Sequence, residues 1–195
     1  MTGVERIILA SASPRRAELL REAGIEFETV AANVDEAVRP GEDPDTYVRR
    51  LAAAKVEAIV GRAEGRPVLA ADTAVVVEGM ILGKPIDRHD ARRMLRLLSG
   101  RAHDVVTGVA VATPAGITAA SESTCVEFRA LTDAEIDAYV ETGEPDGKAG
   151  GYAIQGQAGQ FVSRISGSHS NVVGLPMDLV RALLGGAVRR LAVDD

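Results

Sequence analysis

Two arginines stand where the sequence predicts the beginning of a helix. Ser13 is a typical N-cap residue and Pro14 a typical first helical residue, and Arg15 and Arg16 follow directly. The first turn of a helix has unpaired N–H groups and a partial positive charge, which attract anions and disfavour cations. Two arginines at this place therefore indicate an anionic ligand such as a phosphate. Without a ligand, they would point to solvent or pair with acidic residues further along the helix.

Two acidic residues are candidates for metal or proton chemistry. Asp72 follows the apolar run 68–71, and a carboxylate at the end of a buried strand is costly unless it meets a cation, a metal or several donors. Glu36 follows the second expected strand and could supply a second carboxylate. Together they would suffice for a magnesium ion that also uses substrate phosphates. The alternatives are a turn built by Asp72 with Thr73, and a solvated loop acid at Glu36.

Lysines are scarce, since only Lys55, Lys84 and Lys148 are lysines among the 22 basic residues. Each is therefore a candidate for a role that needs a compact ammonium rather than a planar guanidinium. Lys55 lies on the apolar stripe of an expected helix, where it must either meet an anion or extend to solvent. Lys84 lies in a Gly-Lys-Pro turn. Either lysine could meet a phosphate.

A candidate for recognising a base lies in the glycine-rich segment 147–174. There Gln155 follows Tyr152, Ala153 and Ile154 and precedes Gly156. Its amide offers a donor and an acceptor side by side, as the edge of a nucleobase requires. The alternative is a buried glutamine that satisfies backbone groups.

The elements that must position these residues alternate along the chain, which predicts the α/β class with a mixed sheet. Asp72 is expected at a strand end or break, and the residues 114–116 are expected to turn a hairpin. The predicted strands are 4–10, 27–31, 68–71, 75–77, 105–112, 117–128 and 161–165. The predicted helices begin near residues 14, 44, 88, 133 and 176.

Composition excludes several classes of protein. The 195 residues are 46% hydrophobic, which predicts a single domain over 1–195 with two lobes. A net charge of −6 and an aromatic content of 3% disfavour nucleic-acid binding. Cys125 is the only cysteine, so no internal disulfide or zinc motif is expected. With no signal peptide or membrane span in the sequence, we expect a cytoplasmic protein. Its oligomeric state, including a homodimer, stays open.

Four motifs in order make the chain resemble the Maf family of nucleoside triphosphate pyrophosphatases. These are residues 11–16 (SASPRR), 71–73 (ADT), 83–85 (GKP) and 148–156 (KAGGYAIQG), followed by 170–176 (SNVVGLP). The resemblance spans nearly the whole chain. It implies a long curved mixed sheet similar to that of inosine triphosphate pyrophosphatases, with a nucleotide cleft between two lobes. It also implies hydrolysis between the α and β phosphates.

The resemblance also implies roles for single residues. Asp72 matches the family's catalytic acid, taken as the proton acceptor, while Arg15, Thr73 and Gln155 match positions linked to substrate choice. Glu36, Lys55 and Lys84 match other polar positions that line the site. The Ile-Gln-Gly motif around Gln155 resembles the motif of the family branch that acts on dTTP and UTP, and differs from that of the branch that acts on 7-methyl-GTP. A flipped amide could equally serve cytosine, so chemistry alone leaves the base open.

The resulting hypothesis is a metal-dependent hydrolase. Asp72 and Glu36 would hold Mg²⁺ or Mn²⁺ and activate a water for attack on the α-phosphorus. Basic side chains would neutralise charge on the phosphates, with Ser13 as a further substrate contact. These are Arg15, Arg16, Lys55 and Lys84. The alternative is a nucleotide-binding regulator of septum formation without significant turnover, which would use the same arginines.

Overall fold

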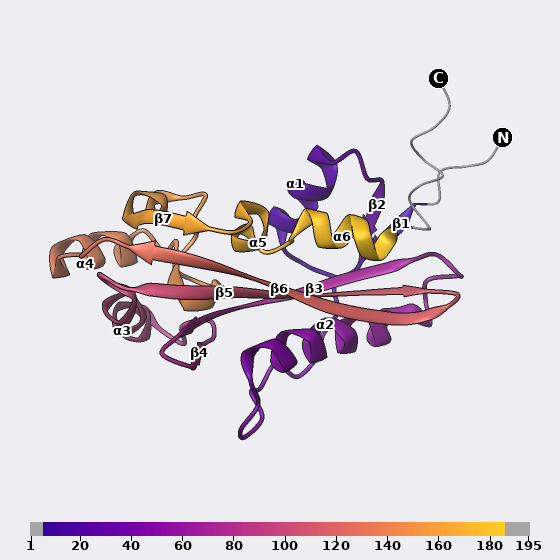
Figure 1. Ribbon diagram of the computed structural model, residues 1–195, viewed down its shortest axis with the longest axis horizontal. Coiled ribbons are helices and arrows are strands. Elements are labelled where there is room, and N and C mark those ends of the chain that lie inside the picture. Colours follow the sequence, from indigo (N-terminus) through magenta and orange to yellow (C-terminus); the bar gives the residue numbers. More distant parts are fainter. Residues whose placement is uncertain (1–5, 186–195) are drawn as a thin grey trace. The chain divides into compact units, whose positions relative to one another are not determined.

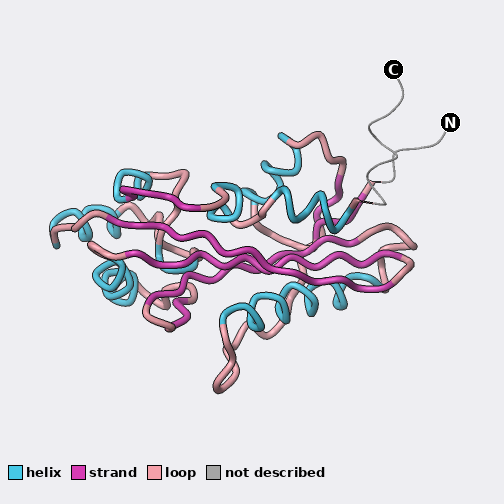
Figure 2. The backbone as a smooth tube through the Cα atoms, viewed as in Figure 1, coloured by secondary structure: helices cyan, strands magenta, loops and turns pink. Residues whose placement is uncertain are grey.

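The computed structural model describes residues 6–185, which form two compact units. The first unit contains the chain up to Asp72, the segment 107–122 and the chain from Gly174. The second unit contains 73–106 and 123–173. Strands β3 (Val68–Val77), β5 (Ala102–Thr113) and β6 (Gly116–Phe128) contribute residues to both units. They are the longest strands in Figure 2.

Seven strands of the described residues form one mixed sheet, and this confirms the predicted α/β class. The order is β2-β1-β3-β5-β6-β7, with β4 beside β3 (Figure 1). Strand β1 pairs in parallel with both β2 and β3, whereas β3 with β4 and β6 with β7 are antiparallel. The shorter strands are β1 (Ile7–Leu9), β2 (Phe27–Thr29), β4 (Met80–Leu82) and β7 (Val162–Ser166).

Alternating side chains divide the core of the first unit into two layers. One layer, which includes Leu9, Leu69 and Val111, packs with helices α1 (Pro14–Glu22) and α6 (Met177–Leu184). The other layer packs with helix α2 (Pro44–Val60) and is rich in alanine. Gly108 belongs to this side, where a Cβ would overlap the backbone of Val48. Small residues therefore let α2 approach the sheet closely.

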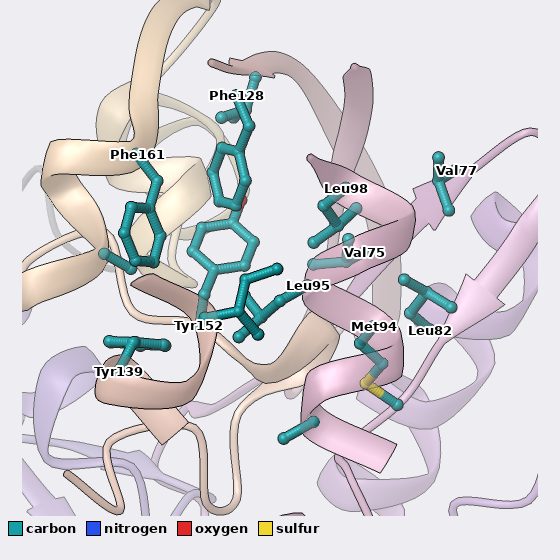
Figure 3. Close-up of a cluster of buried hydrophobic side chains, with 14 of the residues drawn as sticks. Val75, Val77, Leu82, Met94, Leu95, Leu98, Phe128, Tyr139, Tyr152 and Phe161 are labelled. Atoms are coloured by element: carbon teal, nitrogen blue, oxygen red, sulfur yellow. The ribbon is translucent and has the colours of Figure 1, made fainter. Parts of the chain in front are cut away.

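The core of the second unit contains four aromatic residues. Phe128, Tyr139, Tyr152 and Phe161 meet edge to face, with ring centroids 4.9–6.0 Å apart for the three pairs they form (Figure 3). Helices α3 (Arg88–Leu98) and α4 (Asp133–Glu141) supply half of the remaining buried side chains of this cluster. The capping box of Thr132 and Glu135, visible in the sequence, begins α4 as predicted. The segment that carries Gln155 therefore begins at Tyr152, a member of this packed aromatic cluster.

The predicted strand break at Asp72 is wrong. Strand β3 runs through this residue without interruption, because the buried carboxylate has a cationic partner on α2. Helix α5 (His169–Val173) and the short 3-10 turns Ala149–Gly151 and Gln157–Phe161 were not predicted, since the glycine-rich segment shows no helical periodicity. The expected strand over 4–10 is shorter, and its residues 4 and 5 lie outside the described part of the chain. Within residues 6–185, no helix has the length and apolarity that crossing a membrane requires.

Candidate functional site

A buried lysine joins the two candidate acids in the first unit. Lys55 Nζ lies 2.5 Å from Asp72 Oδ1 and 2.8 Å from Glu36 Oε1. Lys55 and Asp72 are 7% and 8% exposed, so the ammonium is needed to offset the buried charge. Asp72 has the same strand parity as Val68 and Ala70, which face α2, and Lys55 lies on the apolar stripe of that helix. Of the two fates predicted for Lys55, contact with an anion is the one observed.

The loop that carries Glu36 is fastened to helix α2. The buried Tyr47 donates a hydrogen bond from its hydroxyl to the carbonyl oxygen of Glu36, at 2.9 Å. Arg50 donates to the carbonyl oxygen of Ala37 at 3.1 Å and binds Glu42 through two hydrogen bonds of 2.5 and 2.7 Å. These contacts fix the loop at Glu36 and at two places after it. The alternative of a freely solvated loop acid is therefore not what the structure contains.

Electrostatics around this cluster follow from burial and from the charges it holds. Burial raises the pKa of Tyr47 to about 12, and the carboxylates of Asp72 and Glu36 add to the effect. The hydrogen bonds from Arg50 lower the pKa of Glu42 to about 2. Near neutral pH, Tyr47 is therefore protonated and Glu42 is ionised.

Helix α1 begins where the sequence predicts, but Ser13 caps it only by position. Its side chain makes no capping hydrogen bond, and the first turn contains no acidic residue. The buried Ser11 instead accepts the backbone N–H of Ser13 at 3.1 Å and an Arg16 N–H at 3.3 Å. Arg16 also donates from Nε to the carbonyl oxygen of Gly174 at 2.8 Å.

Arg16 is held within the first unit rather than extended into solvent. Burial lowers its pKa, and the negative charge of Asp72 opposes that shift. A guanidinium keeps its charge under such conditions, because its ordinary pKa lies far above neutral pH. The helix start thus presents backbone donors and a fixed cation at the same place. Arg15 lies beside it, half-buried.

The remaining predicted residues lie in the second unit. Thr73 follows Asp72 on β3 and is half-buried, while Lys84 and Gln155 are exposed. The backbone N–H of Gly150 donates to the carbonyl oxygen of Gly83 at 3.0 Å, which joins the Gly-Lys-Pro turn to the glycine-rich loop. Gly150 has a φ of +67°, and a Cβ there would lie 2.8 Å from the side chain of Val75. Glycine is therefore required at this contact.

Sequence reasoning included Ser11 only as part of the motif 11–16, without a role of its own. It missed Tyr47 and Arg50, which also support the site. A signal was present for Tyr47, because a tyrosine on the buried stripe of a helix needs a partner for its hydroxyl. No comparable signal marks Arg50, whose partners are separated from it by a loop.

No group of three or more His, Cys, Asp or Glu residues that could hold a metal occurs within residues 6–185. Glu36 and Asp72 nevertheless lie close enough together to contact the same Lys55 ammonium. Two carboxylates are as many as a phosphate-bound magnesium ion usually takes from a protein, with phosphate oxygens and water completing the shell. This pair fits such an ion.

An α/β sheet protein with a lysine–carboxylate cluster beside an arginine-bearing helix start is suited to binding a phosphorylated ligand. The family model described as Maf-like protein matches residues 6–187. The chain belongs to the Maf-like protein family, and the resemblance stated from its motifs is confirmed.

Curated relatives agree with this assignment. One named dTTP/UTP pyrophosphatase, from Geotalea uraniireducens, is 54% identical over 186 residues, covering 94% of this chain and 96% of the relative. Another of the same name, from Chromobacterium violaceum, is 49% identical over 189 residues, covering 94% and 95%. A crystal structure of a Vibrio cholerae protein gives a TM-score of 0.40 at 15% identity, covering 73% of this chain and 79% of that one.

Proposed function

We propose that this chain hydrolyses dTTP and UTP to the nucleoside monophosphate and pyrophosphate. The observation that carries the reaction is the buried cluster in which Lys55 binds both Asp72 and Glu36. The substrate part is supported by the relatives at 54% and 49% identity, which are named dTTP/UTP pyrophosphatases. Those names favour an enzyme over a regulator of septum formation without turnover.

In the proposed reaction, Asp72 accepts a proton from water. The water oxygen bonds to the α-phosphorus, the bond from that phosphorus to the bridging oxygen breaks, and pyrophosphate leaves with the bonding electrons. Glu36 assists by keeping a second negative charge next to Asp72. A buried carboxylate of fixed position is suited to this role, because it needs no reorganisation when the water is deprotonated.

Basic side chains would balance the charge of the triphosphate. Arg16 is already oriented at the start of α1 by Ser11 and Gly174. Arg15 lies in the same helical turn, where backbone N–H groups add further donors. The Lys55 ammonium would neutralise phosphate oxygens as they reach the two carboxylates. We assign Ser13 and Lys84 to the same phosphate-binding role, and Thr73 to substrate choice.

A divalent cation, Mg²⁺ or Mn²⁺, would polarise the phosphate and lower the pKa of the attacking water. Asp72 and Glu36 are the residues that would hold it. Lys55 contacts the same two carboxylates and would remain beside the cation as a second positive charge. The metal, a cytoplasmic location and a homodimer stay predictions.

Base selection falls to Gln155. Its amide would face O4 and N3–H of thymine or uracil, as donor and acceptor respectively. Exposure of this side chain on a glycine-rich loop is consistent with contact to a ligand.

A panel of nucleoside triphosphates tests the proposal. The purified chain is incubated with dTTP, UTP, dCTP, dGTP and ATP, each with Mg²⁺, Mn²⁺ or chelator, and both pyrophosphate and orthophosphate are measured. We expect pyrophosphate from dTTP and UTP with kcat/KM at least about tenfold above the others, and only with metal. Release of orthophosphate instead, or no turnover of dTTP and UTP, would overturn the proposal.

A further inference from the structure

The backbone on both sides of Gln155 is hydrogen-bonded to two side chains outside the loop. Before it, the N–H of Ala153 donates to the hydroxyl of Tyr139 at 3.2 Å. After it, the N–H of Gln157 donates to Oε2 of Glu144 at 3.1 Å. Both partners come from α4 or the turn that follows it. Gln155 is thus centred between two fixed points while its own side chain is exposed.

The two fixed points are themselves joined. The Tyr139 hydroxyl donates to Oε1 of Glu144 at 3.0 Å, so one carboxylate binds the tyrosine through one oxygen and the loop through the other. The Tyr139 ring packs edge to face on Phe161, with centroids 5.2 Å apart (Figure 3). Rotation of the Tyr139 or the Glu144 side chain would therefore break its hydrogen bond to the loop and also its hydrogen bond to the other residue. We call Tyr139 and Glu144 the loop clamp.

The residue between Gln155 and Gln157 is fitted to the clamp. A Cβ on Gly156 would overlap the Glu144 carboxylate, so glycine is needed if Glu144 is to keep its hydrogen bonds. One residue before Ala153, the hydroxyl of Tyr152 is hydrogen-bonded to Nε2 of the buried His103 at 2.8 Å. The backbone from 152 to 157 is thus constrained at three places.

We propose that Tyr139 and Glu144 are positioning residues for base choice, acting by fixing the direction in which the Gln155 amide projects. This rests on the proposed function, in which Gln155 faces the base. Thymine and cytosine present opposite donor and acceptor patterns to an amide, and a loosely held glutamine can turn to serve either. A fixed backbone confines the Gln155 side chain to fewer rotamers, so that its amide meets the edge of a base in fewer orientations.

The test compares kcat/KM for dTTP with kcat/KM for dCTP. Two variants release the clamp without removing its bulk: Tyr139→Phe deletes the hydroxyl but keeps the ring, and Glu144→Gln replaces one acceptor oxygen with a donor. We expect each to lower the dTTP:dCTP ratio about tenfold, as the loss of one hydrogen-bonded alignment permits. The change should come mainly from KM, because the residues of the reaction are untouched.

Glu141→Gln is the matched control. Glu141 is the last residue of α4, the helix that carries Tyr139, and binds Arg88 and Arg92 through exposed ion pairs of 2.7 and 2.9 Å. It has the same charge change as Glu144→Gln and no hydrogen bond to the loop. Its dTTP:dCTP ratio should equal that of the unmodified chain.

A double-mutant cycle with Gln155→Ala decides whether the clamp acts through the amide. If it does, Glu144→Gln lowers the ratio in the original chain and has no further effect once Gln155 is alanine. A full additional effect in the Gln155→Ala background, or an unchanged ratio in both clamp variants while Gln155→Ala lowers it, would overturn the proposal.

Hydrogen exchange of the backbone amides separates failure of the clamp from failure of the proposed function. Glu144→Gln should speed exchange at Gln157, and Tyr139→Phe at Ala153, with the rest of the second unit unchanged. Unchanged exchange at both amides would overturn the clamp whatever the enzyme hydrolyses. Faster exchange in a chain that turns over neither dTTP nor UTP would instead end the proposed function and the role in base choice together.

Discussion

The cluster around Lys55 and the loop around Gln155 hold their key side chains by different means. In the first unit, charged side chains are held by one another: Lys55 and Asp72 are buried, Glu36 is partly exposed, and the two carboxylates share a single ammonium. In the second unit, the backbone is held by hydrogen bonds and aromatic packing, and the Gln155 amide is left exposed. Charge is suited to phosphates, which every nucleotide carries, and a fixed neutral amide is suited to the base.

This difference gives two separable classes of defect. Removing one charge from the cluster leaves another charge buried without its partner, which destabilises the fold and affects all nucleotides. In the proposed function, loosening the loop should leave phosphate binding as before and change which base is preferred. Substitutions in the two regions should therefore differ in stability, in rate and in selectivity.

The largest stability effect is expected for Lys55→Met. Two neighbouring carboxylates would lose their common cation, and we expect the free energy of unfolding at pH 7 to fall by about 3 kcal/mol. Urea denaturation measures this. The control is Arg49→Met on the same helix, where the ion pair with Asp45 is about half exposed and its loss should cost under about 1 kcal/mol. Equal losses in the two variants would contradict the buried cluster.

A pH effect of similar size is expected from His103 in the second unit. Burial lowers its pKa from 6.5 to about 4. Between these values the unfolded chain binds a proton that the folded chain does not, so stability is complete above pH 6.5 and falls as the pH drops toward 4. The loss should be about 3 kcal/mol. The difference in unfolding free energy between the original chain and His103→Gln should shrink over this window, and parallel pH curves would refute the assignment.

The smallest effect is expected for Tyr47→Phe, which removes the hydrogen bond to the Glu36 carbonyl and keeps the buried ring. We expect kcat/KM to fall about tenfold for dTTP, UTP and dCTP alike. Steady-state kinetics with the three nucleotides, beside Tyr139→Phe, measures it. A change in the dTTP:dCTP ratio in Tyr47→Phe would show that the two regions are not separable in function.

Local signals were sufficient for much of the fold. The Ser-Pro start of α1, the start of α2 at Pro44 and the capping box of α4 each depend on residues close in sequence, and these helices begin where predicted. Helix α5 was missed because five residues are too few to show a period. The sequence placed Lys55 on the apolar stripe of a helix but left open whether it meets an anion or extends to solvent, and it did not indicate the two partners.

Long-range contacts account for what the sequence did not predict. From its immediate neighbours alone, Asp72 is predicted to break the strand. The strand continues because Lys55, 17 residues earlier, binds the buried carboxylate. Tyr47 had a sequence signal, but its partner 11 residues away did not, and neither did the partner of Glu144, 13 residues away. Such partners become visible only when hydrogen bonds are known.

The most direct test of the account is pyrophosphate release by Asp72→Asn, measured with Mg²⁺ and saturating dTTP or UTP beside an Asp45→Asn control on the exposed face of α2. The account predicts a loss of kcat by at least about a thousandfold with both nucleotides, while binding of dTTP remains preferred over dCTP. The control should keep its rate. Release of pyrophosphate by Asp72→Asn at the speed of the unmodified chain would contradict the central role of the buried carboxylate.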